Sequence, residues 1–481
     1  MAIRLSTAVA RAVAAMLVTG VLASCALEQP KSPAELQREA LPNTTIPAAW
    51  QAGADAGTLA ASGWLASFGD PALTALVAEA LAHNADLQVA AARVEEAGGN
   101  LQVASAGLLP SVNVPGTYSG KSGGGGGLNA IFLNASLELD VWGRVRYGKA
   151  AAQAQVEATE ADYAYARQSL AATVAKAWFL AIEAGQQRAL LQDSLRATQA
   201  LHDVAAKRFN IGVGDESAVV EADANVGMTR DQLRQTEQAR DEALRALELL
   251  LGRYPAAEIA VAQSLAPMPG PLPAGLPSEL LERRPDVVAA ERRVAAAFNR
   301  VGEAKAARLP RLSLTAGLSA ISSDLLVLQN RDNPSFGVGA TLFAPLYQGG
   351  ALKAQVDIAN AQQKQAMAEY AHVALQSFGQ VENALGVENS LRDREVILAS
   401  VIAANERSLQ LAQTQYQVGK IDMRTVEQRQ LDLVSIRTEL LRVQTDRLAQ
   451  RANLYLVLGG NFEASDTKPA EQGLQSQNGG S

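Results

Sequence analysis

Four segments of the chain alternate apolar and polar residues with a period of two, the pattern of a β-strand with one apolar face. In the segment LNASLELDV, residues 133–141, every second residue is apolar and the others are polar or acidic. The predicted strands are 111–119, 129–141, 311–320 and 335–346. At about 9 to 13 residues, each is long enough to cross a lipid bilayer when tilted.

Between and after these strands the pattern is helical. Residues 116–254 and 346–468 contain no proline, and a proline costs about 3 kcal/mol inside a helix. These two stretches therefore predict long helices at 144–209 and 350–416. A glycine follows each long helix and permits the chain to reverse. These glycines are Gly212 and Gly419.

Four shorter helices complete the pattern. Two of them return from the glycine turns, at 217–251 and 423–458, and two precede the strands, at 86–108 and 286–309. Acidic residues at the start of the latter pair are predicted N-caps, and they are Asp86 and Asp286. The apolar stripes of the long helices contain alanine, glutamine and asparagine. This favours helices with one dry and one wet side, as in the wall of a tube, although a solid bundle is the alternative.

The chain contains two versions of one unit. NADLQVAAARVEEA from Asn84 resembles RPDVVAAERRVAAA from Arg284, and LELLLG ending at Gly252 resembles LYLVLGG near Gly459. A repeat of this size indicates a duplicated unit rather than a solenoid of short repeats. The predicted divisions are a first repeat at 71–254, a linker at 255–275, a second repeat at 276–460 and a disordered tail at 461–481.

The N-terminus predicts export. Residues 1–24 combine positive charge with a short apolar run, as a signal peptide does. That run ends in LASC, and Cys25 is the only cysteine of the chain, so no intrachain disulfide can form. A lone cysteine is usually a small buried apolar residue. The context here resembles a bacterial lipobox, which implies that Cys25 becomes the lipid-modified first residue of the mature protein. Residues 25–70 are then a lipidated, extended segment.

Four strands cannot close a barrel, and an open sheet edge in lipid leaves backbone groups unpaired. A half-buried sheet in a soluble sandwich is the alternative, but no other strand run covers the apolar face. Several chains must therefore contribute to one barrel. Two copies give eight strands with a filled interior, and three copies give twelve strands with room for a channel. Trp142 then suits the membrane interface, or else it is an aromatic packed at a domain junction.

Composition supports no enzymatic or nucleic-acid role. The net charge is −7, and 19% of the residues are charged, with no basic block that would indicate nucleic acid. The sequence has no HExxH, Walker A or dinucleotide glycine motif. Three scattered histidines lack a metal-ligand pattern, and they are His83, His202 and His372. We therefore expect no catalytic, cofactor or metal site, and a passive conduit whose energy comes from partners.

At these residues the chain resembles the outer-membrane factors, the TolC- and OprM-like exit ducts of tripartite efflux pumps, in the NodT-type lipoprotein branch. LELDVWGRVR, RRPDVVAAERRVAAA and LYQGGALKAQV are the most specific stretches. The resemblance implies a mainly helical fold with a small β part. It implies a homotrimer with a long antiparallel coiled-coil α-barrel and a 12-stranded transmembrane β-barrel. It also implies an outer-membrane location, a periplasmic adaptor protein and an inner-membrane pump of the resistance-nodulation-division class.

The resemblance also implies where the duct closes. Family members narrow the pore just after the second glycine turn, commonly with an aspartate nine positions beyond the glycine. Here that position holds Gln428, beside Glu427, and Arg424 stands where a second constriction residue is common. We expect Arg424 and Gln428 to line the aperture and Glu427 to supply neighbouring charge, unless all three are ordinary solvated helix surface. The residues expected to meet the adaptor are Val213, Gly214, Asp215, Lys420 and Ile421.

Three functions remain open at this point. The first is an exit duct for efflux of drugs and other small toxic compounds. The second is the same duct in type I protein secretion. The third is a lipoprotein without a channel that uses its coiled coils as a spacer.

Overall fold

The computed structural model describes residues 27–53, 63–120, 126–272, 274–323 and 335–463. The signal peptide, Cys25 and residues 464–481 of the predicted tail lie outside these residues. The prediction that the tail begins at 461 was wrong, because residues 461–463 are described and the side chain of Phe462 is buried in a hydrophobic core. The described chain divides into two compact units. The sheet unit comprises residues up to 44 with 91–163 and 286–374, and the hairpin unit comprises 45–90, 164–285 and the residues from 375 onward.

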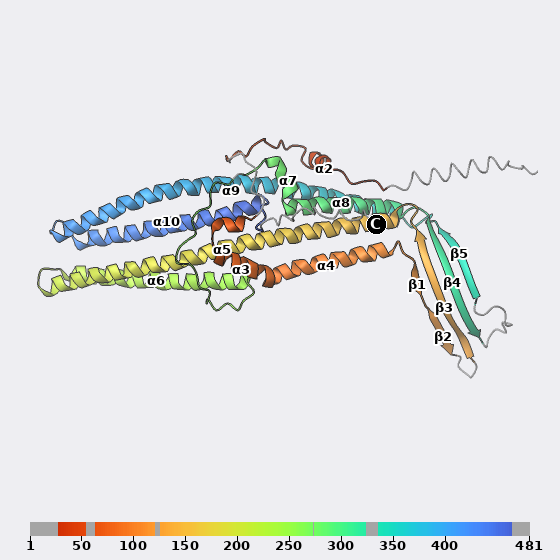
Figure 1. Cartoon of the computed structure of the whole chain (residues 1–481), viewed down its shortest axis with the longest axis horizontal. Helices are drawn as coiled ribbons and strands as arrows, with labels where there is room; N and C mark the ends of the chain where they lie inside the picture. The colour runs from red at the N-terminus through yellow and green to blue at the C-terminus, as the bar shows by residue number, and fades with distance from the viewer. Residues whose placement is uncertain (1–26, 54–62, 121–125, 273, 324–334, 464–481) are drawn as a thin grey trace, which may run out of the picture. The chain divides into compact units, whose positions relative to one another are not determined.

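The sheet unit contains one antiparallel sheet, formed by β1 (Ser111–Asn113), β2 (Gly116–Gly120), β3 (Gly126–Leu139), β4 (Arg311–Ser323) and β5 (Ser335–Phe343). The first predicted strand is split into β1 and β2, which both pair with β3 (Figure 1). The long central pairing joins β3 to β4, from Leu128 opposite Ser323 to Leu139 opposite Leu312. The two repeats therefore build one sheet together.

One face of the sheet is apolar, and no other described residues cover it. Leu133 stands opposite Leu318, which in turn stands opposite Phe336, so the three side chains share a face. Their exposed fractions are 43%, 41% and 74%. Such an apolar band needs a lipid or protein environment.

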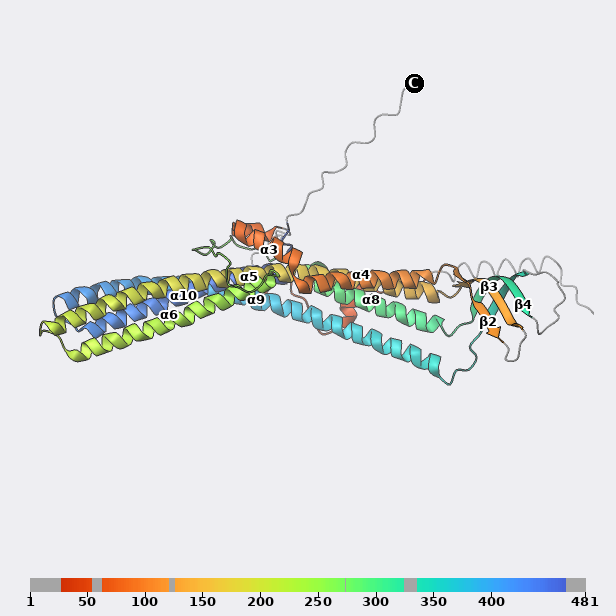
Figure 2. The same ribbon diagram turned by 90° about the horizontal axis from the view of Figure 1, so that it is seen from below.

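The six predicted helices are confirmed. They are α4 (Ala85–Ala106), α5 (Arg144–Asn210), α6 (Glu216–Leu250), α8 (Pro285–Ala306), α9 (Ala351–Gln417) and α10 (Met423–Val457). Figures 1 and 2 show the two hairpins, α5 with α6 and α9 with α10.

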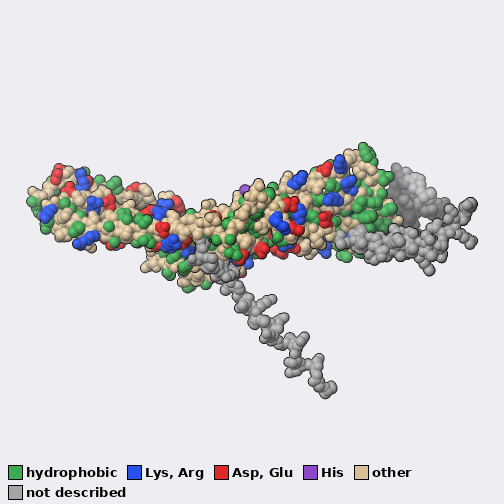
Figure 3. Space-filling model, turned by 90° about the horizontal axis from the view of Figure 1, so that it is seen from above, with side chains coloured by type: hydrophobic (Ala, Val, Ile, Leu, Met, Phe, Trp, Pro, Cys, Tyr) green, Lys and Arg blue, Asp and Glu red, His purple; other side chains and the backbone are tan. Residues whose placement is uncertain are grey.

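None of the helices within the described residues combines the length and the apolar composition needed to span a bilayer. On the face drawn in Figure 3, acidic and basic side chains are mixed along the helices.

Several predictions at the helix starts were wrong or incomplete. Asp86 lies in the first turn of α4, and the cap is Asn84, whose side-chain oxygen accepts from the backbone N–H of Leu87 at 3.0 Å. Asp286 likewise lies within the first turn of α8. Three short helices were not predicted, and they are α2 (Pro33–Ala40), α3 (Pro71–His83) and α7 (Leu280–Arg283). The segment expected to be extended thus contains α2.

The core of the hairpin unit lies where α3 packs against α5 and α6. Trp178 and Phe179 of α5 are fully buried there with Leu73 of α3. The indole N–H of Trp178 donates to Asp70 at 2.7 Å, and Asp70 also caps α3 through the backbone N–H of Leu73. One half-buried carboxylate therefore fixes both the start of α3 and its position on α5.

The two halves of the chain reproduce one contact at the ends of their return helices. The Asn84 side chain donates to the carbonyl of Leu250 at 3.0 Å, and Arg284 donates to the carbonyl of Val457 at 3.1 Å. Asn84 and Arg284 begin the two resembling segments of the sequence. In each half a side chain that precedes the short helix thus satisfies a C-terminal carbonyl of the return helix.

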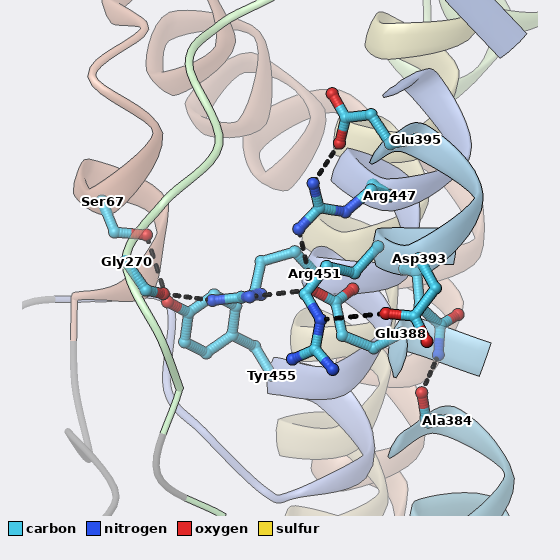
Figure 4. Close-up of polar contacts among 11 residues, drawn as sticks. Ser67, Gly270, Ala384, Glu388, Asp393, Glu395, Arg447, Arg451 and Tyr455 are labelled. Carbon is cyan, nitrogen blue, oxygen red and sulfur yellow. Dashed lines mark hydrogen bonds and ion pairs between the residues drawn. The ribbon is translucent and has the colours of Figure 1, made fainter. Parts of the chain in front are cut away.

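The linker between the repeats is held by a buried ionic cluster, which we call the belt cluster and which consists of Glu388, Glu395, Arg447 and Arg451 (Figure 4). Arg451 of α10 donates to the carbonyl of Gly270 in the linker and, at 3.0 Å, to Glu388 of α9. Glu388 also faces Arg447, which pairs with Glu395. The side chains of Arg451 and Glu388 are only 6% and 12% exposed. The linker is therefore attached to the α9–α10 pair by charge-assisted hydrogen bonds.

The N-terminal segment is attached to α9 beside the linker. The backbone N–H groups of Gln51 and Ala52 donate to the carboxylate of Glu382 at 2.9 and 2.8 Å. The buried ring of Trp50 packs in the same cluster as Ala274 of the linker.

Candidate functional site

The candidate site lies at the two glycine turns of the hairpin unit, which have the same internal geometry. In the α5–α6 turn the backbone N–H of Val213 donates to the carbonyl of Arg208 at 3.0 Å, and in the α9–α10 turn that of Lys420 donates to the carbonyl of Gln415 at 2.9 Å. Gly212 and Gly419 have φ of 75° and 74°, a left-handed conformation that other residues rarely adopt. The glycines at these positions are therefore required by the turns.

An aspartate starts the helix after each turn. Asp215 accepts from the backbone N–H of Ser217 at 3.2 Å, and Asp422 accepts from that of Thr425 at 3.0 Å. Hydrogen bonds from the side chains of Ser217 and Thr425 hold the pKa of each aspartate below its ordinary value. Both carboxylates are therefore ionised caps.

The two turns pack against each other within one chain. Ala205 and Ala222 of the first hairpin enclose Met423 of the second. The Arg208 guanidinium lies 5.2 Å from the centre of the Tyr416 ring, within the range of a cation–π contact. The tips of the hairpins are thus in contact in this structure.

A second contact between the hairpins lies one turn further along. Arg424 of α10 donates to Glu221 of α6 through two nitrogens, at 2.8 and 3.2 Å. The Arg424 side chain is 73% exposed, so the ion pair lies at the surface of the tip. A neighbouring hydrogen bond joins the Asn225 side chain of α6 to Glu427 of α10. We call these two contacts, Arg424 with Glu221 and Asn225 with Glu427, the tip latch.

Glu427 is not an exposed charge. It is 6% exposed, and its carboxylate accepts from the Asn225 side chain of α6 at 3.0 Å. Burial, with a smaller contribution from the negative charge of Glu221, raises the pKa of Glu427 above its ordinary value, although Asn225 and Arg424 oppose this shift. Glu427 therefore lies between the hairpins, whereas Arg424 and Gln428 are exposed.

Gln428 makes its contact on its own helix, since its amide donates to Asp432 at 2.8 Å. Both residues line a groove of about 970 Å³ between α6 and α10, which Leu191 of α5 also lines. Arg424 and Glu427 thus both contact α6, through Glu221 and Asn225. Gln428 does not contact α6 through a hydrogen bond in the described residues, but it lines the neighbouring groove.

Sequence reasoning did not identify Glu221 and Asn225 as the partners of this site. The internal repeat carried the signal, because Glu221 precedes Gln428 by 207 residues and Asn225 precedes Asp432 by the same number. Each repeat therefore supplies a polar pair at equivalent positions, and the carboxylate that is missing at Gln428 stands at Glu221.

The tip residues expected to meet a partner differ in exposure. In the first turn Val213 is 66% exposed and Ile211 is 75% exposed. In the second turn Val418 is 65% exposed. Gly214, Asp215 and Lys420 are exposed, and Ile421 is half-buried. Exposed apolar side chains of this kind indicate a contact surface.

The chain just after Cys25 lies against the sheet unit. The backbone N–H of Glu28 donates to the Tyr147 hydroxyl at 3.0 Å. A Cβ at Gly143 would lie 2.7 Å from the Leu27 side chain. Residues 27 and 28 are therefore held at the junction of β3 and α5. Within the described residues, no group of three or more His, Cys, Asp or Glu side chains could hold a metal ion.

A family model for the outer membrane efflux protein matches residues 76–253 and again residues 276–460. The chain belongs to this family. It is 32% identical to the cation efflux system protein CusC of Escherichia coli, over 84% of this chain and 89% of the relative. It is 30% identical to the pyoverdine export outer membrane protein OpmQ of Pseudomonas aeruginosa, over 83% and 88%.

Solved structures agree with this assignment. The outer-membrane channel OprN superposes with a TM-score of 0.79 at 26% identity, covering 90% of this chain and 99% of OprN. CusC superposes with a TM-score of 0.74 at 28% identity, over the same shares. The protein is therefore an outer membrane efflux channel whose tunnel lies in the periplasm, as the resemblance in the sequence predicted. Its relatives are channels rather than enzymes.

Proposed function

We propose that three copies of this chain form a passive exit duct for small toxic compounds, in which their sheets close one 12-stranded barrel and their hairpins one helical tunnel. The uncovered apolar face of the sheet is the observation that supports this proposal most strongly. β1 and β2 lie end to end along β3 and count as one strand of the barrel, so each chain supplies four. Along the edges formed by β1 with β2 and by β5, the described residues leave backbone groups unpaired, which only neighbouring chains can satisfy in lipid. Twelve strands also leave an interior wide enough for a channel.

The experiment is to measure the mass and conductance of the detergent-extracted protein. We expect a trimer that conducts ions after insertion into a planar bilayer. A stable monomer without conductance would instead support the periplasmic spacer, which needs no barrel.

We further propose that the tip latch controls the periplasmic aperture. Arg424 and Gln428 line the opening, while Glu427 and Asn225 hold α10 against α6. The reason is geometric, since the latch ties the two hairpins of one chain and separation of the hairpins would widen the opening. The tip residues from Val213 to Asp215, with Lys420 and Ile421, would receive a periplasmic adaptor that links the duct to an inner-membrane pump of the resistance-nodulation-division class.

Acid is expected to favour the latched state. Glu427 has a raised pKa when it is buried against α6, and its pKa returns to the ordinary value of a solvated glutamate when the hairpins separate. A carboxyl whose pKa is raised in one state stabilises that state when it is protonated, so latching is strongest below the ordinary pKa and weakens as pH rises through the raised value. Single-channel open probability should therefore fall as pH is lowered.

The Glu427→Gln variant is the control, because it keeps a neutral, hydrogen-bonding side chain at every pH. It should remove the part of the pH dependence that lies above the ordinary pKa of a glutamate. An identical pH profile in the variant and the wild type would exclude Glu427 as the titrating group.

Cys25 is expected to carry acyl chains in the mature protein. Residues 27 and 28 are fixed at the start of α5, so lipid on Cys25 would enter the membrane close to the barrel, and several acyl chains give firm anchoring. Mass spectrometry of the mature N-terminus should find a modified Cys25. An unmodified cysteine, or a mature chain that begins elsewhere, would contradict the prediction.

A further inference from the structure

A second groove, unrelated to the tip latch, lies along the α5–α6 hairpin. It has a volume of about 440 Å³. Its lining is almost entirely charged, and it consists of Arg188, Arg234, Glu237, Gln238, Arg240, Asp241 and Arg245. We call it the arginine groove.

The carboxylates of the arginine groove cannot neutralise its guanidinium groups. Glu237 is shared by Arg234 at 2.9 Å and Arg188 at 3.5 Å. Asp241 lies 3.2 Å from Arg240. Arg245 is exposed and makes no hydrogen bond or ion pair within the described residues. Four positive groups therefore face two negative ones, in a chain whose net charge is −7.

The arginine groove lies on the opposite side of α6 from the groove that contains Gln428. Asn225, Gln232 and Thr236 line the latter. Arg234, Asp241 and Arg245 follow them, each nine residues later. Nine residues are about two and a half helical turns, so each pair of positions points in opposite directions. This inference rests on the proposed function, in which the Gln428 side is the lumen and the arginine groove therefore faces outward.

The arginine groove is also distant from the adaptor-facing turns. α6 begins at Glu216, beside the tip, and Arg234 and Arg245 lie 18 and 29 residues beyond it. At 1.5 Å per residue these separations are roughly 27 and 44 Å. A surface this far from the tip of a periplasmic hairpin would contact the periplasmic material around the tunnel rather than an adaptor bound at its end.

We propose that the arginine groove binds the carboxylates of the cell-wall polymer peptidoglycan. A tunnel that extends from the outer membrane through the periplasm must pass this polymer, whose stem peptides carry free carboxylates. Arginine recognises carboxylates through two parallel hydrogen bonds. The uncompensated guanidinium groups of the outward-facing arginine groove could bind the carboxylates of the stem peptides. This contact would hold the duct in position within the cell wall.

The test is co-sedimentation of the full-length, detergent-solubilised protein with purified peptidoglycan sacculi. Wild-type protein should pellet with sacculi, and roughly tenfold less should pellet after Arg234→Glu with Arg245→Glu. Sacculi whose carboxylates have been converted to amides should lose binding in the same way. The control is Arg196→Glu with Arg392→Glu, which makes the same charge change at exposed arginines outside the groove and should leave pelleting unchanged.

Equal pelleting of the groove variant and the wild type, or undiminished binding to amidated sacculi, would overturn the proposal. So would loss of the trimer in the groove variant, because the groove would then be a contact between copies. Retention of an acidic protein partner without any binding to sacculi would also overturn it. The milder pair Arg234→Gln with Arg245→Gln serves if charge reversal prevents folding. Conductance of the same samples tests the duct separately, since channels that conduct but do not bind sacculi would refute the wall contact alone.

Discussion

Replacing Arg451 by alanine is expected to destabilise the protein by about 3–5 kcal/mol, because it leaves the buried carboxylate of Glu388 without its closest partner. The substitution also frees the linker carbonyl of Gly270, which Arg451 holds. The free energy of unfolding can be measured by equilibrium denaturation of the detergent-solubilised protein, followed by circular dichroism.

Two further variants test the cause of this loss. Arg437→Ala removes a surface pair with Glu406, whose partners are 42% and 44% exposed, and it should cost about 1 kcal/mol or less. Arg451→Met combined with Glu388→Leu removes both buried charges and should recover most of the stability. If Arg451→Ala costs no more than Arg437→Ala, the belt cluster is not the attachment of the linker.

Reversing the charge of Arg424 is expected to open the duct. Arg424→Glu would place a third carboxylate beside Glu221 and Glu427, so the tip latch would repel where it now attracts. Because the proposed trimer carries three latches, the effect would be repeated around the aperture. We expect a roughly severalfold rise in single-channel conductance or open probability at neutral pH and low salt.

The matched control is Arg429→Glu, because Arg429 is on the same helix but faces Asp432 at 3.5 Å rather than α6. Adding Glu221→Arg to Arg424→Glu restores an ion pair with reversed polarity and should restore closure. Wild-type conductance in both Arg424→Glu and Gln428→Ala would remove these residues from the aperture. An open channel that Glu221→Arg does not rescue would show that Arg424 acts through another partner.

Glu427 shows why a site residue read from the sequence can have the wrong environment. Its position one residue before Gln428 suggested a charge near the aperture, whereas the structure buries it against Asn225. Neighbouring residues on a helix point about 100° apart, so adjacent positions in the sequence have different surroundings. Only the packing of α10 on α6 decides which of them faces solvent.

Local signals were sufficient to predict the long helices. The proline-free stretches and the glycines after them predicted α5 and α9 to within one or two residues. The helix α3 was missed although its signals are present, since Asp70 caps it, Pro71 opens it and its buried residues follow a helical spacing. The splitting of the first strand into β1 and β2, around Val114 and Pro115, was also missed.

The sequence by itself thus determined the six longer helices, the period-two strands and the family, because turn formation, side-chain periodicity and family-specific stretches depend on residues close together in the chain. The tertiary structure decided the pairing of β3 with β4, the tip latch between Arg424 and Glu221, and the contact of Arg451 with Gly270 and Glu388. Arg424 and Glu221 are 203 residues apart, and Arg451 and Gly270 are 181 apart. Contacts at such separations depend on which faces of distant helices meet, and no local pattern specifies that.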